Sequence, residues 1–152
     1  MTAWQHVMTA EDIEAFVKRV FPQALAFAGV VRIGEGELTI QLGHDPDGSH
    51  LRPGGTISGP VLMTMADTAF YFLILSLIGP VALTVTTNLN IDFLRRPPAG
   101  AITATARMLK LGKRLASGDV FIHHPDVDGP VARASVTYSI PPPDKRSLGA
   151  KS

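Results

Sequence analysis

The sequence predicts an α+β domain in which a strongly curved antiparallel sheet wraps around one long central helix. Two observations favour this fold. First, the stretch from Val61 to Ile78 is apolar on nearly all sides, which is typical of a helix buried at the centre of a protein. Second, two strand-like segments precede this stretch and four follow it, and short turns join most of them. Only a curved sheet covers such a helix on most sides while one face of its strands stays polar.

Length and charge restrict the protein to a few classes. With 152 residues the chain fits a single domain, expected over residues 1–140, followed by a flexible tail over 141–152. The formal net charge of +1 includes no long basic run, so nucleic acid is not an expected partner. The absence of cysteine excludes disulfides, thiolate metal sites and a cysteine nucleophile. An acidic N-terminal stretch stands where a signal peptide would be basic and then apolar, which favours a cytoplasmic location.

The first expected element is a short amphipathic helix. Thr9 can cap its start, Asp12 stands in for the acidic residue of a capping box, and Pro22 ends the helical spacing of apolar residues. Two strands follow, and the turn Gly34-Glu35-Gly36 pairs them as a hairpin. The bounds expected for these elements are 9–21 for the helix and 24–33 and 37–42 for the strands.

The long helix is expected to begin at Ser58 or Gly59, because Pro60 suits the first turn of a helix, and to end at Gly79-Pro80. The next segment, Val81 to Phe93, alternates apolar and polar residues with a period of two and is the clearest strand in the chain. Three further strands are expected near 102–108, 114–123 and 131–140, with turns at 97–100 and 125–129.

The apolar run also raises the question of a membrane-spanning helix, since about 20 apolar residues cross a bilayer. We reject a membrane span, because Asp67 would lie near the bilayer centre and because Thr64 and Ser76 interrupt the run. No membrane partner is therefore expected.

Asp67 is the one acidic residue in this apolar run. A carboxylate is costly to bury unless a partner or a function compensates for the loss of water. We interpret Asp67 as a catalytic base. The alternative is a buried structural carboxylate that accepts hydrogen bonds from Thr64 or Thr68.

Five segments carry a resemblance to a known family: Gly55–Val61, Asp67–Ala69, Thr86–Arg95, Gly112–Arg114 and Ala132–Tyr138. In order and spacing they resemble the signatures of the PaaI-like hotdog-fold acyl-CoA thioesterases, of the 4-hydroxybenzoyl-CoA thioesterase superfamily. The resemblance extends over residues 36–140. It implies a hotdog fold, hydrolysis of acyl-CoA thioesters by an acidic residue at the position of Asp67, and two subunits joined edge to edge. Such dimers often pair into tetramers, and the CoA group belongs to the substrate, so no separate cofactor is implied.

The spacing of two residues independently favours a dimer. Gly59 and Asp67 are eight residues apart, which separates them by about 12 Å along one helix, too far for both to contact one thioester carbonyl. Two antiparallel copies of the helix about a twofold axis can bring Asp67 of one subunit beside Gly59 of the other.

The resemblance and the chemistry of thioester hydrolysis together suggest roles for five residues. Asp67 is the candidate general base or, alternatively, a nucleophile that forms an anhydride. The N–H of Gly59, at a helix N-terminus, is the candidate oxyanion donor, and Thr86 is expected to orient the attacking water. Ser58 and Arg52 stand where the family commonly has a histidine and an asparagine that position the carbonyl or the water. Alternatively, Ser58 only caps the helix, Gly59 only serves a tight turn, and Thr86 is an ordinary exposed threonine.

Further side chains are candidates for binding the substrate. Four basic residues are expected to hold the phosphates of CoA, unless they are simply solvated: Arg95, Arg96, Lys113 and Arg114. A tunnel for a medium-length or aromatic acyl group is expected beside Met63, Met65, Phe70 and Phe72. No metal site is predicted, because no histidine has metal-ligand spacing with a carboxylate, and His123 and His124 should point to opposite faces of their strand.

Three classes of function remain open. An acyl-CoA thioesterase is favoured. A hotdog dehydratase would use a paired Asp and His, and no histidine lies near Asp67 in sequence. A non-catalytic acyl-CoA binding protein is the third class, which the missing family histidine allows.

Overall fold

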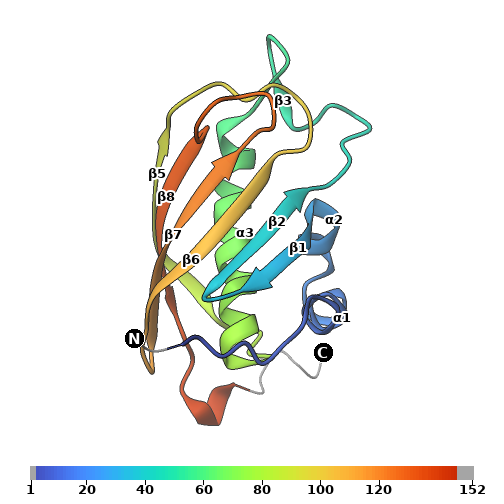
Figure 1. Ribbon diagram of the computed structural model, residues 1–152. Helices are drawn as coiled ribbons and strands as arrows, with labels where there is room; N and C mark the ends of the chain where they lie inside the picture. Colours follow the sequence, from blue (N-terminus) through green and yellow to red (C-terminus); the bar gives the residue numbers. More distant parts are fainter. Residues whose placement is uncertain (1–2, 147–152) are drawn as a thin grey trace.

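The computed structural model describes residues 3–146 and has the predicted architecture (Figure 1). One antiparallel sheet of six strands, in the order β1-β2-β6-β7-β8-β5, curves around α3 (Gly59–Ile78). A small ribbon of β3 (Leu51–Arg52) and β4 (Thr56–Ile57) precedes this helix. The strands of the large sheet are β1 (Ala28–Gly34), β2 (Glu37–Leu42), β5 (Val85–Phe93), β6 (Thr103–Leu111), β7 (Leu115–His123) and β8 (Ala132–Ser139).

Small side chains on the inner face of the sheet let α3 pack close to the strand backbones. They lie on β6, β7 and β8 and are buried: Ala104, Ala106, Ala116, Gly118, Ala132 and Ala134. On the helix, every residue from Ala69 to Leu77 is buried. The helix is long and apolar enough to cross a membrane, but 72% of its apolar window is buried inside the protein. The prediction of a core helix in place of a membrane span is confirmed.

Two helices precede the sheet, where the sequence analysis predicted one. In α1 (Ala10–Val20) the expected capping box is present: the N–H of Asp12 donates to Oγ1 of Thr9, and the N–H of Thr9 donates to the carboxylate of Asp12. The predicted strand from residue 24 is wrong over its first four residues, which belong to α2 (Pro22–Phe27). Proline lacks an N–H that a helix start does not use, so Pro22 begins a new helix after ending the first.

The two edges of the sheet differ. At the β1 edge, α1 and α2 lie alongside (Figure 1), and the carboxylate of Glu14 accepts a hydrogen bond from the N–H of Val30 at 3.2 Å. At the opposite edge, β5 is exposed along most of its length. The strand begins at Val85, later than predicted, and a bulge between Thr86 and Asn88 changes the phase of the alternation.

The glycine-rich turn before α3 and the C-terminal segment are also defined. Gly54 and Gly55, at the tip of the β3–β4 ribbon, have φ angles of 95° and 76°, a region that favours glycine. The ribbon delivers the chain to the first turn of α3. At the other terminus, a short 3₁₀ helix, η1 (Pro143–Lys145), lies in the segment predicted as a flexible tail. Residues 147–152 of that predicted tail lie outside the described residues.

Candidate functional site

Asp67 is held by side chains from two strands. Its Oδ1 accepts a hydrogen bond from Oγ1 of Thr86 on β5 at 2.5 Å and another from the hydroxyl of Tyr138 on β8 at 2.7 Å. Among residues 3–146, no hydrogen bond reaches Oδ2 of Asp67. The side chain is half-buried, although it lies within the apolar run of α3. One carboxylate oxygen is anchored and the other is left for water or a substrate.

The partners of Asp67 differ from the structural alternative considered for it. The hydroxyl of Thr64 donates to the backbone carbonyl of Pro60 at 3.0 Å, and neither Thr64 nor Thr68 bonds to Asp67 in the described part of the chain. Thr86 was singled out from the sequence, but Tyr138 was not. The alternation of β8 could have shown that Tyr138 faces inward, whereas its contact with a residue 71 positions away could not be found that way.

A cavity of about 560 Å³, here called the Asp67 cavity, adjoins this carboxylate. Asp67, Thr86 and Tyr138 are among the polar residues that line it. Apolar and aromatic side chains from α1, α3 and the residues around them form much of the remaining wall: Val20, Phe21, Tyr71, Leu83 and Val85. The tunnel predicted from the sequence is wrong, because Met65, Phe70 and Phe72 are fully buried in the core and Met63 is exposed without lining the cavity.

Two tyrosines give the Asp67 cavity an aromatic wall. The ring of Tyr71 stacks on that of Tyr138 with the ring centroids 6.3 Å apart, and Phe21 meets Tyr71 edge-on at the same separation. Burial raises the pKa of Tyr71 to about 12. The pKa of Tyr138 is also well above its usual value, first because of burial and second because of the negative charge of Asp67. Both hydroxyls are therefore protonated at neutral pH.

A second hollow, of about 450 Å³, lies at the N-terminus of α3 and is called the Gly59 hollow. Three arginines line it together with Gly59: Arg52, Arg95 and Arg96. The N-terminus of a helix carries partial positive charge and unpaired N–H groups, so with these guanidinium groups the hollow suits an anion. The other two predicted phosphate ligands, Lys113 and Arg114, lie in the β6–β7 turn at the opposite end of β6 and do not line the hollow.

Gly59 is the first residue of α3, where a backbone N–H has no partner within the helix. A Cβ atom at this position would lie 3.3 Å from Cζ of Phe93, so glycine keeps the approach to the helix end open. Ser58 occupies the N-cap position, but its side chain makes no capping hydrogen bond, which removes support for the capping alternative.

The two sets of predicted catalytic residues lie apart within one chain. Asp67 and Thr86 line the Asp67 cavity, whereas Gly59 and Arg52 line the Gly59 hollow, and the two spaces share no lining residue. A single chain therefore presents the Asp67 carboxylate in one space and the N-terminus of α3 in another.

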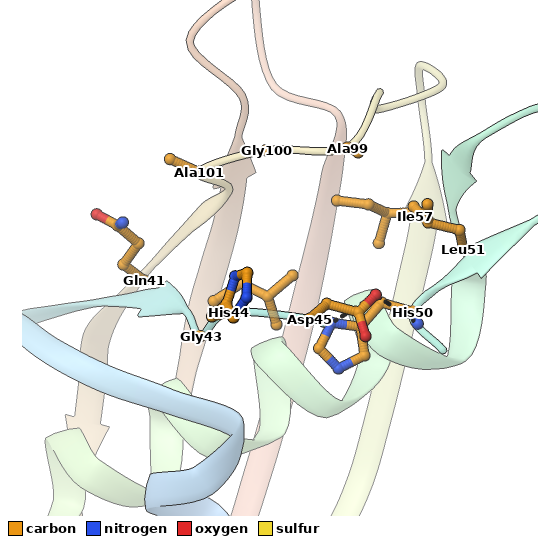
Figure 2. Close-up of a pocket in the computed structure, with 11 residues that line it drawn as sticks. Gln41, Gly43, His44, Asp45, His50, Leu51, Ile57, Ala99, Gly100 and Ala101 are labelled. Atoms are coloured by element: carbon orange, nitrogen blue, oxygen red, sulfur yellow. Dashed lines mark hydrogen bonds and ion pairs between the residues drawn. The ribbon is translucent and has the colours of Figure 1, made fainter. Parts of the chain in front are cut away.

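A third pocket, of about 420 Å³, is lined by a carboxylate, Asp45, and by two histidines, His44 and His50 (Figure 2). Figure 2 shows Asp45 beside His50, with the segment Ala99–Ala101 across from them. The carboxylate of Asp45 accepts hydrogen bonds from the N–H groups of Ser49 and His50 and from the hydroxyl of Ser49. These hydrogen bonds lower the pKa of Asp45, and the bond from the N–H of His50 has the largest effect. Its donors all come from its own loop, so Asp45 closes a turn, and we do not assign it a role as a base.

The remaining histidines have structural explanations or are exposed. His124 is buried, and its ring bonds to the carbonyl of Ala99 through Nε2 and to the N–H of Asp126 through Nδ1, while His123 is exposed. The two therefore point to opposite faces, as predicted. Within residues 3–146, no three His, Asp or Glu side chains are grouped so that they could hold a metal ion.

Comparisons with known proteins agree with this fold. Residues 54–131 match the model of the thioesterase superfamily. A proposed thioesterase from Silicibacter sp. TM1040 is 40% identical over 93% of this chain and 97% of its own, with a TM-score of 0.82. A variant of the phenylacetic acid degradation protein PaaI from Thermus thermophilus is 26% identical over 79% of this chain and 99% of its own, with a TM-score of 0.66.

A third structure is similar in fold alone. Zebrafish thioesterase superfamily member 2 is 20% identical over 88% of this chain and 99% of its own, with a TM-score of 0.74. A search of curated proteins gave no significant match.

Proposed function

Because the chain belongs to the thioesterase superfamily, whose reaction is thioester hydrolysis, we propose that it hydrolyses acyl thioesters of coenzyme A to the free acid and CoA. The observation that carries this proposal is the Asp67 carboxylate, which has one anchored oxygen and one open oxygen beside a cavity large enough for an acyl group. No histidine lines that cavity within the described residues, which favours hydrolysis over dehydration.

In the proposed mechanism, Asp67 acts as a general base. Water attacks the thioester carbonyl carbon and gives its proton to the open Oδ2 of Asp67, while Thr86 holds the carboxylate and the water in line. The tetrahedral intermediate then collapses, the bond between carbon and sulfur breaks, and the thiolate of CoA takes the proton back from Asp67. Nucleophilic attack by Asp67 through an anhydride is the alternative for the same residue.

The proposed oxyanion donor is the N–H of Gly59 from a second subunit. Within one chain Gly59 and Asp67 line separate spaces, so a complete site requires a partner. An exposed edge strand offers unpaired backbone groups, and β5 is exposed along most of its length, which supports a homodimer joined at the β5 edges. We further propose that two dimers associate into a tetramer and that the protein acts in the cytoplasm, without a separate cofactor.

The two spaces divide the proposed substrate between them. The acyl group occupies the Asp67 cavity, where the aromatic wall suits a medium-length or aromatic chain. The phosphates of CoA cannot lie at Gly59 itself, because the pantetheine arm separates them from the thioester carbonyl that the Gly59 N–H contacts. We propose that Arg95 and Arg96, as expected from the sequence, contact the phosphates where the pantetheine arm leaves the Gly59 hollow, with Arg52 beside them. Lys113 and Arg114 lie away from this hollow, so we leave them out of the phosphate site.

A panel of acyl-CoA substrates, with release of free thiol as the readout, tests the proposed function. The wild-type protein should turn over at least one of them, and Asp67→Asn should lower kcat by about 10²–10⁴-fold, because an amide cannot accept the proton. Turnover unchanged in Asp67→Asn would refute the base. Binding of acyl-CoA with no turnover on any substrate would favour the non-catalytic binding protein instead.

Sedimentation tests the shared site separately. The protein should sediment as a dimer or tetramer at micromolar concentration. A folded monomer that retains turnover at that concentration would contradict a site built from two subunits.

A further inference from the structure

We propose that Tyr138 is a positioning residue for the reaction, whose hydroxyl fixes Oδ1 of Asp67 so that Oδ2 faces the substrate. This inference rests on the proposed function, since it assigns the working atom of the proposed base. Tyr138 reaches Asp67 at two points, because its hydroxyl lies 2.7 Å from Oδ1 and 3.1 Å from the backbone carbonyl of the same residue.

The ring of Tyr138 has little freedom to move. The residue is 3% exposed, and its ring lies 5.6 Å from that of Phe70 and 6.3 Å from that of Tyr71, measured between centroids. Close packing on both neighbours fixes where the hydroxyl points. The position of the donor is therefore set by the core and does not depend on the substrate.

The hydroxyl of Tyr138 also stays a donor throughout the working pH range. Its pKa is raised, first by burial and second by the charge of Asp67, so ionisation of the phenol is strongly disfavoured. A phenol that keeps its proton beside a carboxylate stabilises the charged form of that carboxylate. The hydrogen bond from Tyr138 is therefore kept on Oδ1 of Asp67 while Oδ2 takes up and returns the proton.

Thr86, the other donor to Oδ1, differs from Tyr138 in its surroundings. It lies on the edge strand β5 and is exposed in the single chain, whereas Tyr138 is packed into the core. We therefore assign the support fixed by the core to Tyr138 and the support next to the attacking water to Thr86.

Tyr138→Phe removes only the hydroxyl and keeps the ring, so it isolates this hydrogen bond. The matched control is Tyr71→Phe, which removes the neighbouring buried hydroxyl, a donor to the carbonyl of Ala82 at 3.2 Å. We expect Tyr138→Phe to lower kcat about tenfold with a smaller change in KM, because the base loses a donor while the cavity keeps its aromatic wall. Tyr71→Phe, which leaves both donors to Asp67 in place, should change KM more than kcat.

Melting temperatures of both variants separate a positioning role from a structural one. Similar losses of stability with an unchanged kcat in Tyr138→Phe would overturn the inference, because the hydroxyl would then serve packing alone. An equal loss of kcat in both variants would also overturn it.

The experiment distinguishes this inference from the proposed function. If the wild-type protein is active and Asp67→Asn is not, an unchanged Tyr138→Phe refutes only the role of Tyr138. If the wild-type protein turns over no substrate, the proposed function fails, and the ¹³C resonance of the Asp67 carboxyl group still tests the hydrogen bond. Its chemical shift should change in Tyr138→Phe and stay in place in Tyr71→Phe, and an unchanged chemical shift in Tyr138→Phe would refute the contact.

Discussion

Gly118, near the middle of β7, lies close to both the neighbouring strand β6 and the core helix α3, and Gly118→Ala tests that packing. An added Cβ atom would overlap the backbone carbonyl oxygen of Arg107 on β6 and would lie 2.6 Å from Cε2 of Phe70 on α3. The oxygen belongs to the backbone beside a bulge in the β6–β7 pairing, so it cannot swing away as a flexible side chain would. Strands and helix must separate to admit one methyl group.

The expected cost follows from this overlap. Forcing an extra methyl group into a packed core destabilises a protein by about 1–3 kcal/mol. For a chain of this size, that loss lowers the melting temperature by about 3–10 °C. Phe70 follows Asp67 by one turn of α3 and packs on Tyr138, so activity should fall as well.

Gly34→Ala is the matched control for this experiment. Gly34 also lies in a strand of the same sheet, but a Cβ atom there would meet nothing within 4 Å. Thermal unfolding followed by circular dichroism should show a clear loss for Gly118→Ala and little change for Gly34→Ala. Equal melting temperatures for the two variants would refute the close packing of α3 on β7.

Three further outcomes are expected. Thr86→Val should lower kcat/KM about tenfold, because Asp67 loses a hydrogen-bond donor. The control Thr87→Val removes a hydrogen bond to the carbonyl of Thr137 and should not lower kcat/KM. Equal losses in a thiol-release assay would contradict the role of Thr86. Arg96→Ala should raise KM about fivefold for acyl-CoA but leave KM for the matching acyl-pantetheine unchanged, and an equal rise for both would exclude phosphate binding. Phe21→Ala should reduce the differences in kcat/KM among acyl groups, because it removes the edge-on aromatic contact with Tyr71 in the wall of the Asp67 cavity. An unchanged order of kcat/KM across acyl chain lengths would show that Phe21 does not contact the acyl group.

Local signals in the sequence predicted most of the fold. The capping box of Thr9 and Asp12, the proline in the first turn of α3 and the glycine that ends α3 each act within a few residues, and the structure contains all three. The uniformly apolar character of α3 predicted a helix covered on most sides, because no other arrangement shields it from water. By contrast, a proline can end one helix or begin the next. Pro22 was expected only to end a helix, but it also begins α2.

The candidate site was harder to predict because its contacts span the chain. Asp67 and Thr86 are 19 positions apart and were paired through resemblance to a family, whereas the contact with Tyr138 depends on the register of β8 against α3. The acyl pocket was misplaced for a similar reason, since α1 and the start of α2 supply part of its wall and no periodicity within α3 reveals them. The basic residues around 95 and 113 were expected to bind the same phosphates because they carry the same charge. They lie at opposite ends of β6, which charge alone does not reveal.

The central claim is that a base on one subunit works with a helix N-terminus on its partner, and mixed dimers test it most directly. Asp67→Asn and Gly59→Val should each be nearly inactive alone while keeping the circular dichroism spectrum of the folded protein. When equal amounts are unfolded and refolded together, half of the dimers are mixed, and in each mixed dimer one site carries both substitutions and the other carries neither. The account predicts that the mixture recovers about a quarter of the wild-type rate. A mixture no more active than its two components would contradict a site shared between subunits.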